Sequence, residues 1–187
     1  RICGIFLPFV PTNPNLPTGT DRVFAAIQNI TNINQYFSII NLQGDMPLIN
    51  SNDIAQANLP LHQGFDIGSL VTNFRDENEV NDKNITKAKI EWIKKEVIGK
   101  AIDFSKDISS IEGNNLYHHV GIYSFQYETL KKFISLQPSK NESQRRLEQM
   151  RALDAKMTIG VGYVKDVPFG VDTKEDLLKA EKIIKNL

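Results

Sequence analysis

The chain has little cysteine, little histidine and no excess charge of either sign. Its 187 residues include 1 cysteine, 3 histidines and 22 basic against 22 acidic residues. A lone cysteine excludes an internal disulfide, and we expect a reducing, cytoplasmic location. Balanced charge gives no basic surface for nucleic acid, and the longest apolar runs fall far short of the roughly 20 residues of a membrane span. We therefore expect neither nucleic acid nor a membrane as a partner.

Several common chemistries also lack their motifs. His118 and His119 are adjacent and so point to opposite faces of a strand, and Cys3 stands alone, so no structural zinc site follows from spacing. Ser105 does not lie in a G-x-S-x-G turn, which removes the anchor of a hydrolase triad. Gly160-Val161-Gly162 lacks the third glycine of a dinucleotide-binding loop.

The order of apolar patterns predicts one α/β domain over residues 1–187, with helices on both faces of a sheet. Short apolar or alternating runs predict strands at 36–42, 66–74, 87–92, 97–105, 117–125 and 157–164. The third is expected to be half-buried, because Ala88, Ile90 and Trp92 alternate with Lys87, Lys89 and Glu91. The pair at 87–92 and 97–105, joined by Lys94-Lys95, is expected to form a hairpin.

Helical spacing predicts the covering elements. The first begins with Thr20 or Asp21 as its cap, and Pro60 is expected to end the next, which starts near Ser51. One continuous helix is expected over 142–153. In the terminal helix Thr173 and Asp176 are spaced as a capping box, and the inner face is formed by Leu177, Leu178, Ala180, Ile183 and Ile184.

Carboxylates at two places are candidate ligands. Asp45, in Gln43-Gly44-Asp45, follows a buried strand, where open α/β sheets bind their ligands, although the triplet alone is equally compatible with a polar turn. Asp172 precedes the terminal helix and would serve there as an N-cap. If the two carboxylates converge, their oxygens suit Mg²⁺, with substrate phosphates completing the coordination. His119 alone favours a hydrogen-bonded core histidine, while Glu148 and Gln149 lie on an amphipathic helix.

Seven segments in order are similar to one known family. They are Thr18-Gly19-Thr20-Asp21-Arg22, Asn41-Leu42-Gln43-Gly44-Asp45-Met46-Pro47, Phe104-Ser105-Lys106, His119-Val120-Gly121-Ile122-Tyr123, Gln137-Pro138-Ser139, Leu147-Glu148-Gln149-Met150-Arg151 and Gly170-Val171-Asp172-Thr173-Lys174-Glu175-Asp176. Together they resemble the 3-deoxy-manno-octulosonate (Kdo) cytidylyltransferases, the CMP-Kdo synthetases of lipopolysaccharide assembly.

The resemblance implies a three-layer α/β/α mixed sheet of the nucleotide-diphospho-sugar transferase type, with a β-hairpin insertion. It implies that the anomeric hydroxyl of Kdo attacks the α-phosphate of CTP, giving CMP-Kdo and pyrophosphate, in a homodimer. The implied catalytic residues are Asp45 and Asp172, which hold Mg²⁺. Near the nucleotide it implies Thr18, Gly19 and Gln43, and around the sugar acid it implies Lys106, His119, Tyr123, Glu148 and Gln149.

Two departures from the family pattern leave alternatives open. Lys106 stands where the family has arginine, and a lysine lacks the planar fork that grips a carboxylate, so a CMP-sugar synthetase for a sialic-type acid remains possible. The family's initial strand and its basic R-x-x-S-x-R-x-P-G-K loop have no counterpart here. We therefore expect an N-terminally truncated domain, and a catalytically inert folded remnant is the other alternative.

Overall fold

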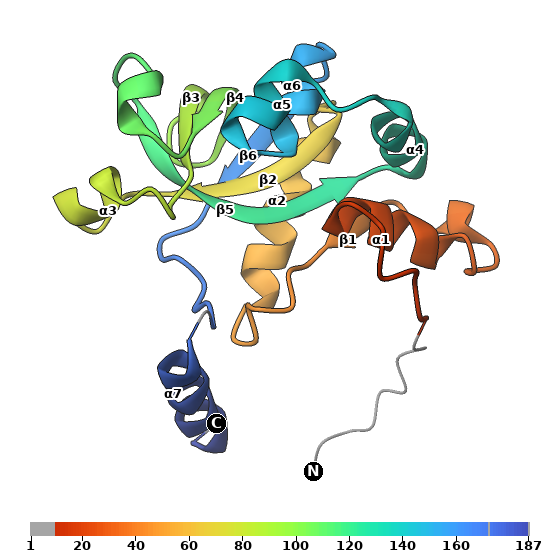
Figure 1. Ribbon diagram of the computed structural model, residues 1–187, viewed down its shortest axis with the longest axis horizontal. Coiled ribbons are helices and arrows are strands. Elements are labelled where there is room, and N and C mark those ends of the chain that lie inside the picture. The colour runs from red at the N-terminus through yellow and green to blue at the C-terminus, as the bar shows by residue number, and fades with distance from the viewer. Residues whose placement is uncertain (1–9, 172, 187) are drawn as a thin grey trace.

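The computed structural model describes residues 10–171 and 173–186, in which a mixed sheet carries helices on both faces (Figure 1). The strand order is β1-β5-β2-β6-β4-β3, with β2 and β6 parallel and the other neighbours antiparallel. The strands are β1 (Ile39–Asn41), β2 (Ile67–Thr72), β3 (Lys87–Lys94), β4 (Ile98–Ser105), β5 (Leu116–Phe125) and β6 (Ile159–Tyr163). The expected hairpin is confirmed as β3 and β4, which belong to the main sheet.

Helix α2 covers one face and several helices cover the other. The helices are α1 (Gly19–Ile27), α2 (Ser51–His62), α3 (Glu77–Asn81), α4 (Tyr127–Ser135), α5 (Lys140–Arg145), α6 (Gln149–Asp154) and α7 (Lys174–Lys185), with short 3-10 turns at Ile33–Gln35 and Ile108–Ser110. Buried side chains from α1, α4 and α6 join the sheet in one cluster, and Ala57 of α2 joins a second cluster. The predicted three-layer α/β class is thereby confirmed. Across the described ranges, no helix is long and apolar enough to cross a membrane.

Strand β5 is the longest strand and carries a bulge in its middle. One edge pairs with β1 through residues 123–125 and with β3 through residues 116–118. On the other edge the register against β2 shifts between Gly68 and Leu70, whose partners are Ser124 and Val120. The extra residues bend the strand. As a result the rings of His119 and Tyr123 lie only 5.6 Å apart, although four positions separate them.

Glycines seat α2 directly on the sheet. A Cβ at Gly68 would lie 2.2 Å from the carbonyl oxygen of Ala57, and one at Gly162 would lie 2.3 Å from that of Gln56. Pro60 was expected to end this helix, but the helix continues to His62. Proline removes only its own N–H from the helical ladder, and here it packs in the buried layer against the position of Gly160.

Three other helix predictions are wrong. The cap of α1 is Thr18, whose hydroxyl accepts from the Asp21 amide, rather than Thr20 or Asp21. The stretch 142–153 forms two helices, because Arg146 adopts a left-handed conformation between them. In α7 the capping box is present, but the supposed inner face is 42–51% exposed at Leu177, Leu178, Ile183 and Ile184. This helix stands apart from the sheet in Figure 1, so only Ala180 of that face is buried.

Candidate active site

The turn after β1 carries Gln43 and Asp45 at the edge of the sheet. Asn41, the last residue of β1, pairs with Tyr123 of β5, so the turn begins beside that tyrosine. Asp45 is exposed, and its carbonyl oxygen accepts a hydrogen bond of 2.8 Å from the Val171 amide. The predicted partner, Asp172, lies outside the described residues, so the pairing of the two carboxylates stays a prediction. Within residues 10–171 and 173–186, no group of three or more His, Cys, Asp or Glu side chains is placed to hold a metal ion.

Hydrogen bonds connect the segment expected near the nucleotide with the segment expected near the sugar. The hydroxyls of Thr18 and Thr20 contact the two carboxylate oxygens of Glu148, at 2.9 and 3.0 Å. The buried Asn41 amide donates to Thr20 at 3.2 Å, which joins β1 to the same network. Gly19 lies between the two threonines and is exposed. The first turn of α1 is therefore tied to the start of α6.

Glu148 carries an altered acidity in this network. Burial raises the pKa of its carboxyl, and the hydrogen bonds from Thr18 and Thr20 only partly oppose that effect. Thr18 Oγ also lies 2.6 Å from a carboxylate oxygen of Asp21. Because a hydroxyl has one hydrogen, Thr18 donates to one of the two acids at a time. A proton on Glu148 satisfies the remaining contact, so the structure favours the protonated form of Glu148 more than water does.

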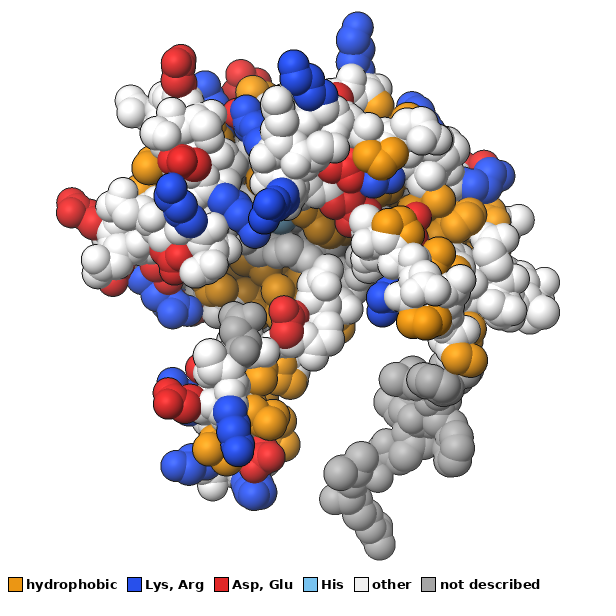
Figure 2. All heavy atoms as spheres, viewed as in Figure 1, with side chains coloured by type: hydrophobic (Ala, Val, Ile, Leu, Met, Phe, Trp, Pro, Cys, Tyr) orange, Lys and Arg blue, Asp and Glu red, His pale blue; other side chains and the backbone are white. Residues whose placement is uncertain are grey.

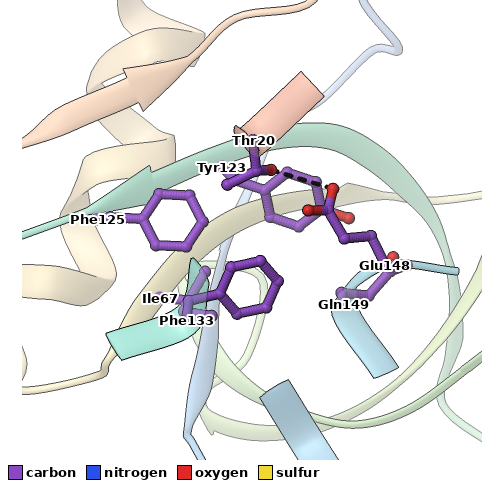
Figure 3. Close-up of a pocket in the computed structure, with 7 residues that line it drawn as sticks. All are labelled: Thr20, Ile67, Tyr123, Phe125, Phe133, Glu148 and Gln149. Carbon is purple, nitrogen blue, oxygen red and sulfur yellow. Dashed lines mark hydrogen bonds between the residues drawn. The ribbon is translucent and has the colours of Figure 1, made fainter. Parts of the chain in front are cut away.

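Glu148 and Gln149 open onto a small cavity, which Figure 3 shows with its lining side chains. Tyr123 and Thr20 complete its polar side, and Ile67, Phe125 and Phe133 form its apolar side. Gln149 is 5% exposed, and its side-chain Nε2 has no hydrogen-bond partner. A buried donor without a partner is costly, so this amide is a candidate donor to an acceptor in the cavity. The space itself is scarcely larger than a water molecule.

His119 lies next to Tyr123, and its ring is held by Ser69 of the neighbouring strand β2. Ser69 Oγ donates to the Ile122 carbonyl at 2.8 Å, which leaves its oxygen to accept from His119 Nε2 at 2.9 Å. This arrangement assigns the hydrogen to Nε2 and leaves Nδ1 as an acceptor. Burial lowers the pKa of His119 to about 3 and raises the pKa of the Tyr123 hydroxyl. Both side chains therefore stay neutral near neutral pH.

Comparisons with known proteins give the family of this chain. A family model described as cytidylyltransferase matches residues 2–159. The 3-deoxy-manno-octulosonate cytidylyltransferases of Paramagnetospirillum magneticum and Rickettsia typhi are 35% and 40% identical, over 94% and 91% of this chain and 72% and 69% of their own lengths. The chain belongs to the 3-deoxy-manno-octulosonate cytidylyltransferase family.

Solved structures agree with this cytidylyltransferase in fold. A CMP:2-keto-3-deoxy-manno-octonic acid synthetase complexed with CTP aligns with a TM-score of 0.77 at 24% identity, covering 92% of this chain and 70% of that one. An apo UDP-glucose pyrophosphorylase aligns with a TM-score of 0.59 at 15% identity, covering 89% of this chain and 59% of the other. The resemblance stated from the sequence is thus confirmed at the level of family and fold.

Lys106 differs in place from the other residues expected around the sugar. It is exposed just after β4 and does not line the small cavity. Figure 2 shows several Lys and Arg side chains near the centre of the face in view. Sequence reasoning also missed Ser69 and Lys87, both buried polar residues of the cytidylyltransferase sheet. Their positions within strand patterns gave no sign of a polar role, because their acceptors are backbone carbonyls, among them Ile122 for Ser69 and Lys106 for Lys87.

The buried His119 should make this cytidylyltransferase sensitive to moderate acid. Unfolded histidine binds a proton below a pKa of about 6.5, whereas folded His119 does so only near 3, so the unfolded state holds more protons between these values. Stability is therefore fully present above pH 6.5 and falls as the pH falls. From pH 8 to pH 5 we expect this histidine to remove about 2 kcal/mol from the free energy of unfolding.

Urea unfolding at the two pH values checks this result. His119→Gln should show a pH dependence that is smaller by the same amount, while His62→Gln, at an exposed position, serves as the control. If the free energy of unfolding changed equally between pH 8 and pH 5 in His119→Gln and in the unmodified chain, the lowered pKa of His119 would be contradicted.

Proposed function

We propose that this chain catalyses the formation of CMP-Kdo and pyrophosphate from CTP and Kdo, for lipopolysaccharide biosynthesis. The observation that carries the proposal is the contact of Thr18 and Thr20 with Glu148. It joins the segment that we assign to the nucleotide with the segment that we assign to the sugar acid. A cytidylyl transfer needs both substrates in one place, because positioning and charge neutralisation account for most of its catalysis.

The sugar acid is proposed to bind between β5 and α6. A Cβ at Gly121, between His119 and Tyr123 in the sequence, would meet no atom within 4 Å, which leaves open space at the bulge. The free Nε2 of Gln149 and the acceptor Nδ1 of His119 suit sugar hydroxyls, which both donate and accept. Lys106, exposed at the end of β4, is proposed to face the carboxylate.

On the nucleotide side we propose Thr18, Gly19 and Gln43, at the start of α1 and after β1. Cytidylyltransferases generally use a divalent metal ion, and we propose Mg²⁺ held by Asp45 and Asp172. Carboxylate oxygens are suitable ligands for this ion. The hydrogen bond from the Val171 amide to the Asp45 carbonyl supports the proposal, because Val171 directly precedes Asp172 in the sequence. When bound, Mg²⁺ supplies positive charge for the triphosphate and the leaving pyrophosphate.

The proposed reaction forms one bond to phosphorus and breaks one. The anomeric oxygen of Kdo forms a bond to the α-phosphorus of CTP, the bond from that phosphorus to pyrophosphate breaks, and the hydroxyl proton is released. The chain's own residues orient the sugar and keep its hydroxyl near the α-phosphate. We further propose a cytoplasmic location, where CTP is available, and a homodimer.

Turnover by the purified chain with CTP, Kdo and Mg²⁺, followed by pyrophosphate release, tests the proposal. Gln149→Leu should raise the KM for Kdo by about tenfold, since the ligand loses a hydrogen bond in a buried site, and leave the KM for CTP unchanged. Gln144→Leu, on the exposed side of α5, is the matched control.

Each contrary outcome has a defined meaning. Absence of turnover by the folded chain would support the inert-remnant alternative. Faster turnover with N-acetylneuraminate than with Kdo would support a synthetase for a sialic-type acid. Turnover that persists in excess EDTA would contradict the role proposed for Mg²⁺.

A further inference from the structure

Lys87 is a fully buried lysine whose ammonium group is surrounded by backbone carbonyls. Its side chain is 0% exposed. The Nζ atom donates to the carbonyl oxygens of Asp82, Ile85 and Lys106, the last two at 2.9 and 3.0 Å. Three acceptors satisfy all three N–H groups of an ammonium. Burial lowers the pKa of Lys87, and the charges of Asp82 and Asp107 oppose that effect.

The three carbonyls belong to segments that meet at the proposed sugar site. Asp82 and Ile85 precede β3, whereas Lys106 follows β4. Lys87 pairs with His118 in the sheet, and the preceding Thr86 accepts a hydrogen bond of 2.9 Å from the His119 amide. Lys87 therefore lies between the strand that carries His119 and the turn that carries Lys106.

The turn after β4 has one ion pair with the loop before β3, between Lys83 Nζ and Asp107 Oδ2 at 3.6 Å, and because both side chains are exposed this pair contributes little. Ser105 Oγ lies 2.6 Å from Ser110 Oγ and accepts from the Asp107 amide at 3.0 Å. These bonds fix the turn internally, but they do not tie the Lys106 peptide to the rest of the sheet. The bond from Lys87 to the Lys106 carbonyl makes that connection. Charge-assisted bonds of this kind are stronger than neutral ones.

A buried ammonium is an expensive way to fill a strand position. An apolar side chain would avoid the desolvation cost, as replacements of buried ionic groups often show. We propose that Lys87 is a positioning residue, which fixes the Lys106 backbone so that the Lys106 side chain is directed at the carboxylate of the sugar acid. This inference rests on the function proposed above and deepens it. It assigns part of the sugar specificity to a residue that does not touch the sugar.

The test compares Lys87→Met with Lys100→Met, an exposed lysine of β4. Lys87→Met should raise the KM for Kdo by about tenfold, because a displaced contact loses most of its value. The KM for CTP and kcat should change by less than about threefold, and Lys100→Met should match the unmodified chain. In a double-mutant cycle, adding Lys87→Met to Lys106→Met should raise the KM for Kdo no further.

Amide hydrogen exchange supplies a second readout that needs no substrate. The amides of Asp107 and Ser110 should exchange about tenfold faster in Lys87→Met than in Lys100→Met. If the unmodified chain does not use Kdo, the proposed function fails, and this exchange comparison alone decides whether Lys87 holds the turn. Unchanged exchange overturns the holding role. Faster exchange with an unchanged KM for Kdo, or additive effects in the cycle, overturns the positioning role.

Should Lys87→Met fail to fold, Lys87→Arg keeps the charge and the buried hydrogen bonds but moves the carbonyls apart, since guanidinium is larger and planar. It should still raise the KM for Kdo severalfold. An unchanged KM in folded Lys87→Arg, together with unchanged exchange at Asp107, would overturn the inference.

Discussion

Asp45→Asn should lower kcat about 10³-fold, because an amide replaces the carboxylate proposed to hold Mg²⁺ opposite the triphosphate. The substitution leaves the backbone of the turn intact, since the bond from the Val171 amide goes to the main-chain oxygen of Asp45. Pyrophosphate release at saturating CTP and Kdo measures the effect. Raised Mg²⁺ concentration should restore part of the activity, because the remaining ligands bind the ion more weakly.

The matched control is Glu112→Gln, which removes an exposed carboxylate from the loop before β5. It should leave kcat unchanged. A kcat for Asp45→Asn within about threefold of the unmodified value would contradict the role of Asp45, since losing one of two carboxylate ligands cannot be neutral in a metal-dependent step.

Gly162→Ala should reduce the free energy of unfolding by about 3 kcal/mol, at the upper end of overpacking effects. The added Cβ would lie 2.3 Å from the Gln56 carbonyl oxygen and 3.0 Å from its carbon. The backbone atoms of a helix cannot move individually to relieve this contact, whereas a flexible side chain could change its rotamer. Relief requires α2 to lift from β6 along the contact that it shares with the sheet. Urea unfolding with an unchanged m-value gives the measurement.

Gly44→Ala provides the comparison, because a Cβ there meets nothing within 4 Å. We expect its stability to stay within about 0.5 kcal/mol of the unmodified chain. Similar losses in the two variants would show that the close approach of α2 to Gly162 does not limit stability.

Features set by neighbouring residues were predictable from the sequence. The hairpin of β3 and β4 follows from alternating side chains on either side of a Lys94-Lys95 turn, and the capping box of Thr173 and Asp176 follows from spacing alone. The break between α5 and α6 was not predictable in this way. Apolar spacing continues across it, and the two helices are separated by residues 146–148, which begin with the left-handed Arg146.

In the candidate site, too, some residues could be named from the sequence and others could not. The family resemblance named Tyr123, Glu148 and Gln149, which the fold does bring to one cavity. The alternation in β3 placed Lys87 among solvent-facing residues, yet it is fully buried. Its acceptors are main-chain carbonyls of separate loops, and a carbonyl leaves no trace in the amino-acid sequence. Asp172 lies outside the described residues, so its pairing with Asp45 stays a prediction.

The two faces of the sheet differ in how easily they can separate. On the α2 face, backbone meets backbone at Gly68 and Gly162, and sliding there would force atoms into collision. On the other face, α1 is tied to α6 by the two hydroxyl contacts with Glu148, each worth about 1 kcal/mol. Releasing both contacts costs about 2 kcal/mol, and separating α1 from the core also exposes the apolar side chains of Ile27, Val23 and Phe24. A ligand that takes over the hydroxyls of Thr18 and Thr20 would remove these two contacts, so ligand-coupled movement is expected on this face and not on the α2 face.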